Sequence, residues 1–166
     1  MSDAPKEIVK RIETPIHLTF QFTPGVGASR FLRAIAEGKI LGLRCTKCAK
    51  VYVSPRGSCP KCGAPTIDEA KVMDRGTITS FSIVRVPSEG IDIELPFVCA
   101  SILLDGADNT FYHVIRDVPV EDVRMGMRVA AVWVPREELK ASLESIRYFK
   151  PTGEPDAPFD SYKEHL

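Results

Sequence analysis

The sequence predicts a mainly β fold, with one N-terminal helix, a small metal-bound ribbon and a five-stranded barrel. Two pairs of cysteines stand close together in the first half of the chain. Five runs rich in β-branched and aromatic residues follow them, at residues 76–86, 95–104, 110–116, 128–134 and 146–149. Such runs, separated by turn residues, are typical of a small antiparallel barrel. We therefore divide the chain into an N-terminal arm with one strand (1–27), helix plus ribbon (28–68), barrel (69–151) and a C-terminal tail (152–166).

Length and composition are those of an ordinary globular protein, with 166 residues of which 44% are hydrophobic and 27% charged. A chain of this size can bury one moderate core, or a small module beside one domain of about 100 residues. The N-terminus is charged and lacks the apolar stretch of a signal peptide. The longest nearly apolar run, residues 96–104, is too short to span a bilayer. We expect a cytoplasmic protein with reduced cysteines and no membrane contact.

Within the N-terminal arm, residues 15–23 alternate between apolar and polar side chains, and we name them the alternating segment. Ile16, Leu18, Phe20 and Phe22 would share one face of a strand. Pro24 and Gly25 end the pattern. Because no hairpin partner is adjacent in sequence, this strand must pair at a distance or with another chain. Its apolar face fits either a partner interface or packing on the chain's own ribbon.

The next segment, residues 28–37, has the periodicity of a helix. Phe31, Leu32 and Ile35 fall on one face, and Gly38 is well placed to cap the C-terminus. Residues 39–44 then predict a short strand that leads into the first cysteine pair. A second short strand, residues 51–53, is expected between the two pairs.

The four cysteines of the two pairs predict a metal site of the rubredoxin-like zinc-ribbon type. They are Cys45, Cys48, Cys59 and Cys62, arranged as two C-x-x-C knuckles separated by ten residues. Zn–S bonds of about 2.3 Å require four thiolates at one point, and each knuckle delivers two of them. Gly63 follows the second knuckle, where a positive φ lets the turn fold back on its sulfurs, whereas Ala49 follows the first.

Other roles for these cysteines fit the sequence less well. Two disulfides would suit a secreted chain, and a dithiol redox site usually begins a helix in a βαβ unit. A catalytic zinc keeps an open position, which a closed set of four cysteines does not provide. Iron would fit the same four sulfurs, so the choice between zinc and iron stays open. The metal is expected to organise the fold rather than to perform chemistry.

Net charge is zero, but the charges are unevenly distributed. Residues 28–62 carry eight basic side chains and one acidic one, whereas residues 63–166 carry 11 basic and 18 acidic. This asymmetry indicates either that the ribbon meets an anionic surface or ligand, or that it presents a solvated basic face.

The five strand-like runs are connected in a way that fits an OB-fold barrel. Residues 105–109 form a loop between the second and third runs, and residues 117–127 make a longer connection where this fold usually carries an extra turn or helix. Residues 136–143 fit either a short helix or the limb of a loop. Residues from 152 onward are rich in Pro, Asp and Gly.

Three motifs occur in an order that resembles a known family. The C-T-K-C…C-P-K-C-G knuckles are followed by D-R-G-T-I-T-S-F-S-I-V and then by E-D-V-R-M-G-M. Together, over residues 28–151, they resemble the zinc-ribbon/OB-fold proteins associated with acyl-CoA enzymes. The resemblance implies a non-catalytic subunit that packs on a thiolase-superfamily enzyme, as in a heterotetramer, and helps to shape its acyl-CoA site. The alternating segment lies outside the matched part.

Several functional residues follow from this reading. Arg44, Lys47 and Arg56 flank the knuckles and are candidates to contact the phosphates of CoA. Cys99 and His113 lie inside apolar strands and are better explained as a buried small side chain and a structural histidine than as catalytic groups. The chain is therefore not expected to be catalytic alone. The alternative is a single-stranded nucleic-acid-binding protein, since ribbons and OB-folds both serve that role.

Overall fold

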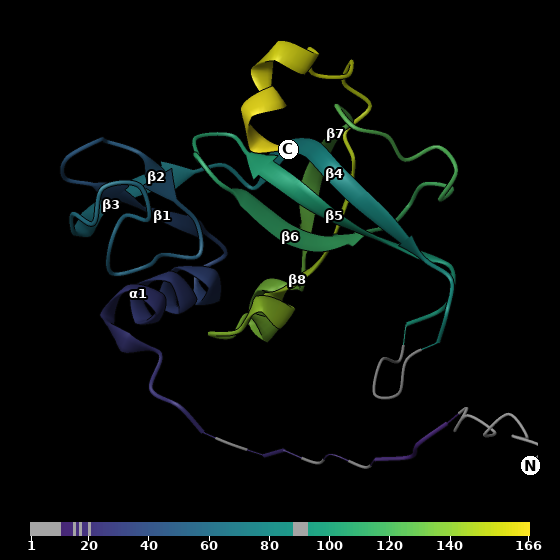
Figure 1. Ribbon diagram of the computed structural model, residues 1–166, viewed down its shortest axis with the longest axis horizontal. Coiled ribbons are helices and arrows are strands. Elements are labelled where there is room, and N and C mark those ends of the chain that lie inside the picture. The colour runs from purple at the N-terminus through teal and green to yellow at the C-terminus, as the bar shows by residue number, and fades with distance from the viewer. Residues whose placement is uncertain (1–10, 15, 17, 20, 88–92) are drawn as a thin grey trace, which may run out of the picture.

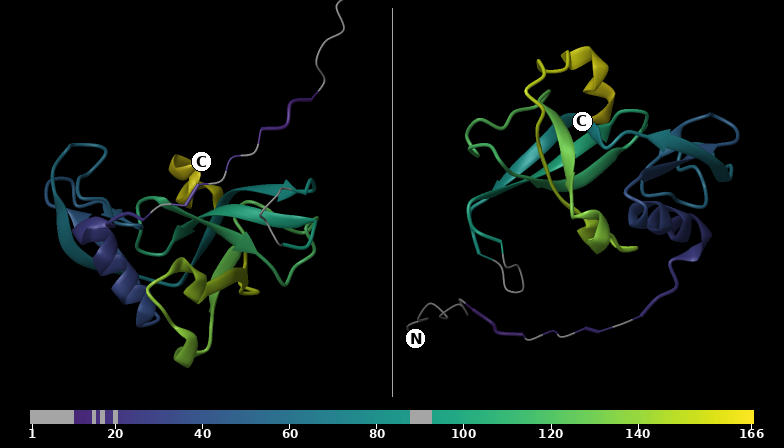
Figure 2. Two further views of the ribbon diagram at one scale, coloured as in Figure 1. Left: turned by 90° about the horizontal axis from the view of Figure 1, so that it is seen from below. Right: turned by 180° about the vertical axis from the view of Figure 1, so that it is seen from behind.

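A computed structural model describes residues 11–14, 16, 18–19, 21–87 and 93–166. One α-helix and a three-stranded ribbon sheet lie beside a closed five-stranded barrel (Figure 1). The C-terminal segment packs at the barrel, on the side away from the helix (Figure 2). This architecture confirms the predicted fold class, a mainly β chain with an N-terminal helix, a ribbon and an OB-fold barrel.

Helix α1, Gly25–Ala36, begins three residues earlier than the sequence predicts. Phe31 and Ile35 are its buried residues. Its C-terminus is a Schellman motif, because Gly38 has a φ of 72° and donates to the carbonyl of Ile35, while Lys39 donates to that of Ala34. The predicted glycine cap at Gly38 is thus confirmed.

The ribbon sheet has the strand order β2-β1-β3. Its strands are β1 (Ile40–Cys45), β2 (Val51–Tyr52) and β3 (Thr66–Val72). Strand β3 pairs antiparallel with β1 along its length, from Ile40↔Val72 to Cys45↔Thr66. We did not predict β3, because Asp68, Glu69 and Lys71 leave it with little apolar alternation. These three charged residues are exposed, while Thr66, Ala70 and Val72 are buried.

The barrel closes in the order β4-β5-β6-β8-β7. Its strands lie within two residues of the predicted runs at every end: β4 (Arg75–Val84), β5 (Phe97–Leu104), β6 (Thr110–Ile115), β7 (Arg128–Trp133) and β8 (Ile146–Pro151). The pairing of β6 with β8 is parallel and the other four pairings are antiparallel. Residues 136–143, left open by the sequence, contain the 3-10 turn Arg136–Glu138.

One continuous hydrophobic core joins the ribbon to the barrel. It includes Phe31 and Ile35 of α1, Val51 of β2, and barrel residues such as Ile102 and Phe149. The loop between β5 and β6 strengthens this junction. Asp108 and Asn109 bond to the free edge of β2, where the N–H groups of Val51 and Val53 donate to their side chains over 2.8 Å. Ribbon and barrel are therefore held together by packing and by this polar clamp.

The segment after β8 is ordered against the barrel, although its composition suggests a tail. Arg124 donates to both carboxylate oxygens of Asp156, over 2.6 and 2.8 Å. Ala157 donates to the carbonyl of Gly126, and the ring of Tyr162 is buried. A Cβ at Gly126 would lie 3.2 Å from the Ala157 carbonyl oxygen, so close packing and a φ of 89° both favour glycine there.

The alternating segment leaves the folded body at the start of α1 (Figure 1). Its described residues, 16, 18–19 and 21–23, form no strand in the single chain, and residues 15, 17 and 20 lie outside the described residues. Pairing with another chain stays a prediction. Among the described residues, no helix has the length and apolarity needed to cross a membrane.

Candidate metal centre and its surroundings

The four cysteines of the two knuckles converge at the end of the ribbon. Their sulfur atoms all lie within 4.8 Å of one another. Sγ of Cys45 lies 3.5 Å from that of Cys62, and Sγ of Cys48 lies 3.6 Å from that of Cys59. Four sulfurs bound at about 2.3 Å to one tetrahedral ion would stand about 3.8 Å apart. The donor set and its size therefore fit a single metal ion.

The two knuckles have nearly the same backbone geometry. In the first, Ala49 has a φ of 59° and donates to the carbonyl of Cys45 over 3.1 Å. In the second, Gly63 has a φ of 67° and donates to the carbonyl of Cys59 over 2.9 Å. Each turn thus folds back on its own first cysteine, as the sequence predicts for Gly63. Ala49 adopts the same left-handed conformation despite its Cβ, which costs about 1 kcal/mol.

Donors around the sulfurs favour their thiolate forms. The hydroxyl of Tyr52 lies 3.3 Å from Sγ of Cys59, and this hydrogen bond lowers the pKa of Cys59 to about 6. The N–H of Cys48, 3.4 Å from Sγ of Cys45, lowers the pKa of that thiol. At Cys62 the N–H of Ala64 acts to lower the pKa, but burial and the neighbouring thiols raise it to about 11. A cation among the four sulfurs would offset this mutual repulsion.

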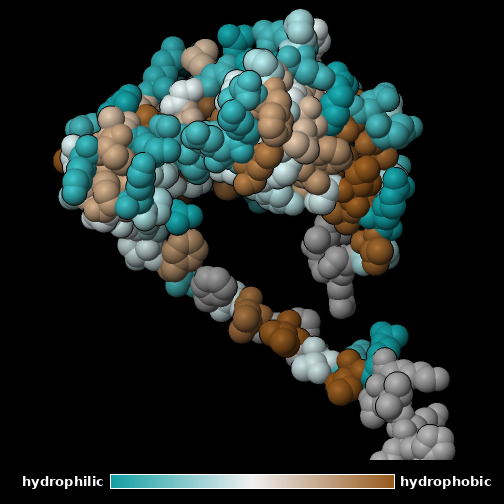
Figure 3. Space-filling view, turned by 45° about the horizontal axis from the view of Figure 1, so that its top comes forward, coloured by the Kyte–Doolittle hydropathy of each residue, from teal (hydrophilic) through white to brown (hydrophobic). Residues whose placement is uncertain are grey.

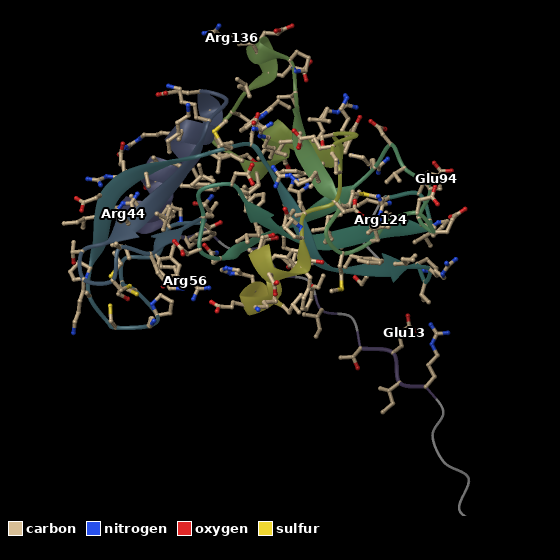
Figure 4. The ribbon with its side chains drawn as sticks, turned by 90° about the horizontal axis from the view of Figure 1, so that it is seen from above. Glu13, Arg44, Arg56, Glu94, Arg124 and Arg136 are labelled. Atoms are coloured by element: carbon tan, nitrogen blue, oxygen red, sulfur yellow. The ribbon has the colours of Figure 1, made fainter. Side chains whose placement is uncertain are left out.

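The three predicted CoA contacts are exposed side chains on the ribbon. Arg44 points out from β1 and donates to the carbonyl of Ala49 over 3.0 Å. Lys47 lies inside the first knuckle and Arg56 follows β2. Figure 4 places Arg44 and Arg56 at the ribbon, away from Arg124 and Arg136 of the barrel. The geometry does not test whether these side chains contact CoA, so their role stays a prediction.

A groove of about 820 Å³ between α1 and β3 holds further cations that the sequence did not single out. Arg33, Lys39 and Lys71 lie at this groove, together with apolar residues such as Leu41 and Met73. Glu37 pairs with Lys39 over 2.9 Å. The sequence alone did not indicate this groove, because the groove depends on β3. That strand brings Lys71 beside the helix, and we did not predict it.

Cys99 and His113 do not form a nucleophile–base pair. Ala100 of β5 is directly opposite His113 of β6, and Cys99 is opposite Val114, so the two side chains point to opposite faces of the sheet. His113 is stacked on Phe111, with ring centroids 6.0 Å apart, and its Nδ1 accepts from the N–H of Val114. These contacts are those expected of a structural histidine. Cys99 is only partly buried, because it lies on the outer face of β5.

Residues 33–68 match the rubredoxin-like zinc ribbon domain of ChsH2, and residues 69–134 match the C-terminal OB-fold domain of ChsH2. A DUF35 domain-containing scaffold protein of Methanocaldococcus jannaschii is 34% identical over 95 residues, which are 57% of this chain and 67% of that protein. The chain belongs to the ChsH2/DUF35 family. A scaffold protein of the same description from Pyrococcus furiosus is 28% identical over 63% of this chain and 76% of its own length.

Two solved structures share the ChsH2/DUF35 fold. One is described as the Ltp2-ChsH2(DUF35) aldolase, with a TM-score of 0.59 and 20% identity over 76% of this chain and 95% of that chain. The other is a DUF35-family protein of Sulfolobus solfataricus, with a TM-score of 0.54 and 17% identity over 74% of this chain and 81% of its own. At these identities the likeness shows the fold alone. The family predicted from the three motifs is confirmed by the two matched domains and by the relative from Methanocaldococcus jannaschii.

Proposed function

We propose that this chain is an accessory scaffold subunit of a thiolase-type enzyme that acts on CoA thioesters. Membership of the ChsH2/DUF35 family is the observation that carries the proposal, since relatives are described as scaffold proteins and one structure as an aldolase containing Ltp2. The catalytic groups would belong to the partner. The separation of Cys99 from His113 supports this division of roles.

The four-cysteine cluster would hold one structural zinc ion. Cys45, Cys48, Cys59 and Cys62 offer four sulfurs and no open position, which suits an ion that organises the two knuckles. Bound zinc would hold the loop that carries Lys47 in one conformation. It would thereby also fix the exposed surface beside Arg44. Iron is the other ion for four thiolates, and elemental analysis of the purified chain distinguishes the two.

The test of the scaffold role is affinity purification of the tagged chain from its native host. We expect a thiolase-superfamily subunit in fixed proportion, as in a heterotetramer, and one zinc per chain. The isolated chain should not turn over acyl-CoA thioesters. Purification with no thiolase-like subunit, or turnover by the isolated chain, would contradict the proposal.

Nucleic-acid binding is less well supported by the barrel. The outer face of β4, β5 and β6 presents Ser80, Ser82, Cys99, Ser101 and Tyr112, and every residue of these three strands is described. Single-strand binding requires cations beside stacking aromatics. This face has one exposed tyrosine, and the one cation of these three strands, Arg75, already pairs with Asp105 and Glu154. An electrophoretic shift with single-stranded DNA or RNA at moderate salt would reverse this preference.

Within the scaffold role, Arg44, Lys47 and Arg56 would contact the phosphates of CoA. All three are exposed on the most basic part of the chain, where charge-assisted hydrogen bonds to phosphate can form. In the complex, the triple variant R44A/K47A/R56A should bind a CoA thioester about tenfold more weakly, as one lost charged contact costs about 1.5–3 kcal/mol.

The matched control removes three exposed arginines of the barrel, R85A/R116A/R147A, and should change CoA-thioester affinity less than about twofold if only distant, screened charges are lost. A second triple variant, R33A/K39A/K71A, tests the groove between α1 and β3. If only the groove variant weakens binding, the phosphate contact lies there and the assignment to Arg44, Lys47 and Arg56 is wrong.

A further inference from the structure

The alternating segment exposes large apolar side chains to solvent. Ile16 and Leu18 are 73% and 79% exposed, and Phe22 on the same face is 75% exposed. In the space-filling view the N-terminal segment extends away from the folded body and carries a strip of hydrophobic residues (Figure 3). A strip of this kind, alternating with polar residues at period two, has the form of a strand that has yet to join a sheet.

The described residues of the alternating segment pair with no sheet edge of this chain. The barrel is closed, although β4 pairs with β7 only at Arg75–Thr77 and β6 pairs with β8 only at Ile115. In the ribbon sheet, the edge of β2 is already bonded to Asp108 and Asn109. The remaining edge strand, β3, exposes Asp68, Glu69 and Lys71, and such charges oppose addition of an apolar strand. A second copy of the chain presents the same edges and the same charges.

We propose that the alternating segment adds as a strand to an uncharged sheet edge of the thiolase-type catalytic subunit, with Ile16 and Leu18 against apolar side chains beside that edge. This inference rests on the proposed function and assigns the segment a role in assembly. Main-chain hydrogen bonds would supply part of the affinity, and the alternate side chains would select the partner. The segment lies before residue 33, so it stands outside the part of the chain that matches the family domains.

The test compares two double variants on opposite faces of the segment. I16S/L18S removes apolar contacts, whereas T19S/Q21S alters only exposed polar residues. Each is titrated, as the full chain with its metal, against the catalytic subunit obtained by the affinity purification described above. I16S/L18S should bind at least tenfold more weakly, and T19S/Q21S should stay within about twofold of the unaltered chain, because only the first variant removes apolar side chains that the partner would bury.

Both variants should keep the metal content and melting temperature of the unaltered chain, because these side chains lie outside its core. Amide hydrogen exchange adds a readout that side-chain contacts alone would not give. Backbone amides of residues 16–22 should become protected only in the complex, with the alternation of a paired strand.

Three outcomes overturn the inference. Equal binding by I16S/L18S and the unaltered chain rejects the segment while the scaffold role stands. Protection of residues 16–22 in the chain without its partner shows that the segment packs on its own chain or on a second copy. If the unaltered chain binds no thiolase-like subunit, the proposed function fails and this inference fails with it.

Discussion

The knuckle end of the ribbon, residues 45–50 and 59–64, and the barrel are stabilised by different interactions. Around the sulfurs the buried cluster contains only Cys45, Tyr52 and Cys59, with Cys48, Cys62 and Ala64 partly buried beside them. The barrel instead surrounds a core with fully buried Ile78, Ile102, Val129 and Phe149. A small module without enough apolar volume typically depends on a metal, whereas a closed barrel buries its own core. Charge follows the same division, since the ribbon segment is basic and the rest acidic.

The largest expected effect is loss of the metal from the knuckle end. Cys59→Ser removes a buried ligand, and binding of a structural zinc is worth about 10–16 kcal/mol in isolated zinc-finger peptides. We expect the metal content to fall from one per chain to none. Amides of residues 45–64 should then exchange rapidly, while those of β5 stay protected.

Cys99→Ser is the matched control, since Cys99 is a partly buried cysteine outside the cluster. It should keep the metal and the protection of both regions. If Cys59→Ser retained one metal ion per chain, the four-sulfur site would be wrong. If β5 lost its protection together with the ribbon, the barrel would not be independent of the metal.

A substitution in the barrel core tests the other region. Phe149 is 0% exposed and its ring lies 5.5 Å from that of His113 and 6.2 Å from that of Phe111. Phe149→Ala leaves a cavity and should lower the free energy of unfolding by about 3–5 kcal/mol, measured by denaturant titration. Phe159→Ala, at a site that is 53% exposed, should cost less than about 1 kcal/mol. Equal losses at the two sites would contradict this placement of the core.

The next largest loss of stability is expected at the junction between the ribbon and the barrel. Asn109 accepts from the N–H of Val53 over 2.8 Å and donates to its carbonyl over 2.7 Å. Asn109→Ala would leave these two groups of Val53, directly after β2, without their partner and should cost about 1–3 kcal/mol. Exchange of the Val53 amide should accelerate more than that of amides in β5. Ser80→Ala, at an exposed barrel position, should change neither the free energy of unfolding nor the exchange rate of the Val53 amide.

Sequence predicted what depends on local pattern. The cysteine spacing located the four-cysteine cluster, and β-branched runs located the five barrel strands within two residues at every end. It missed β3, whose exposed face carries Asp68, Glu69 and Lys71 and whose pairing with β1 is a long-range property. It also missed the polar clamp at Asn109, since residues 105–109 have the composition of any loop. The groove at Lys71 and the packing of Tyr162 depend on the same kind of distant contact.

The smallest expected effect is a dependence of barrel stability on pH that comes from His113. Burial beside the aromatic rings lowers the pKa of His113 below its ordinary value of 6.5. Protonation is therefore easier in the unfolded chain, so the contribution to stability is complete above pH 6.5 and declines as the pH falls below it. Melting temperatures between pH 7.5 and about 5 should fall less steeply for His113→Gln, which does not titrate. Equal slopes for the two proteins would mean that His113 has the same pKa in the folded and unfolded chains.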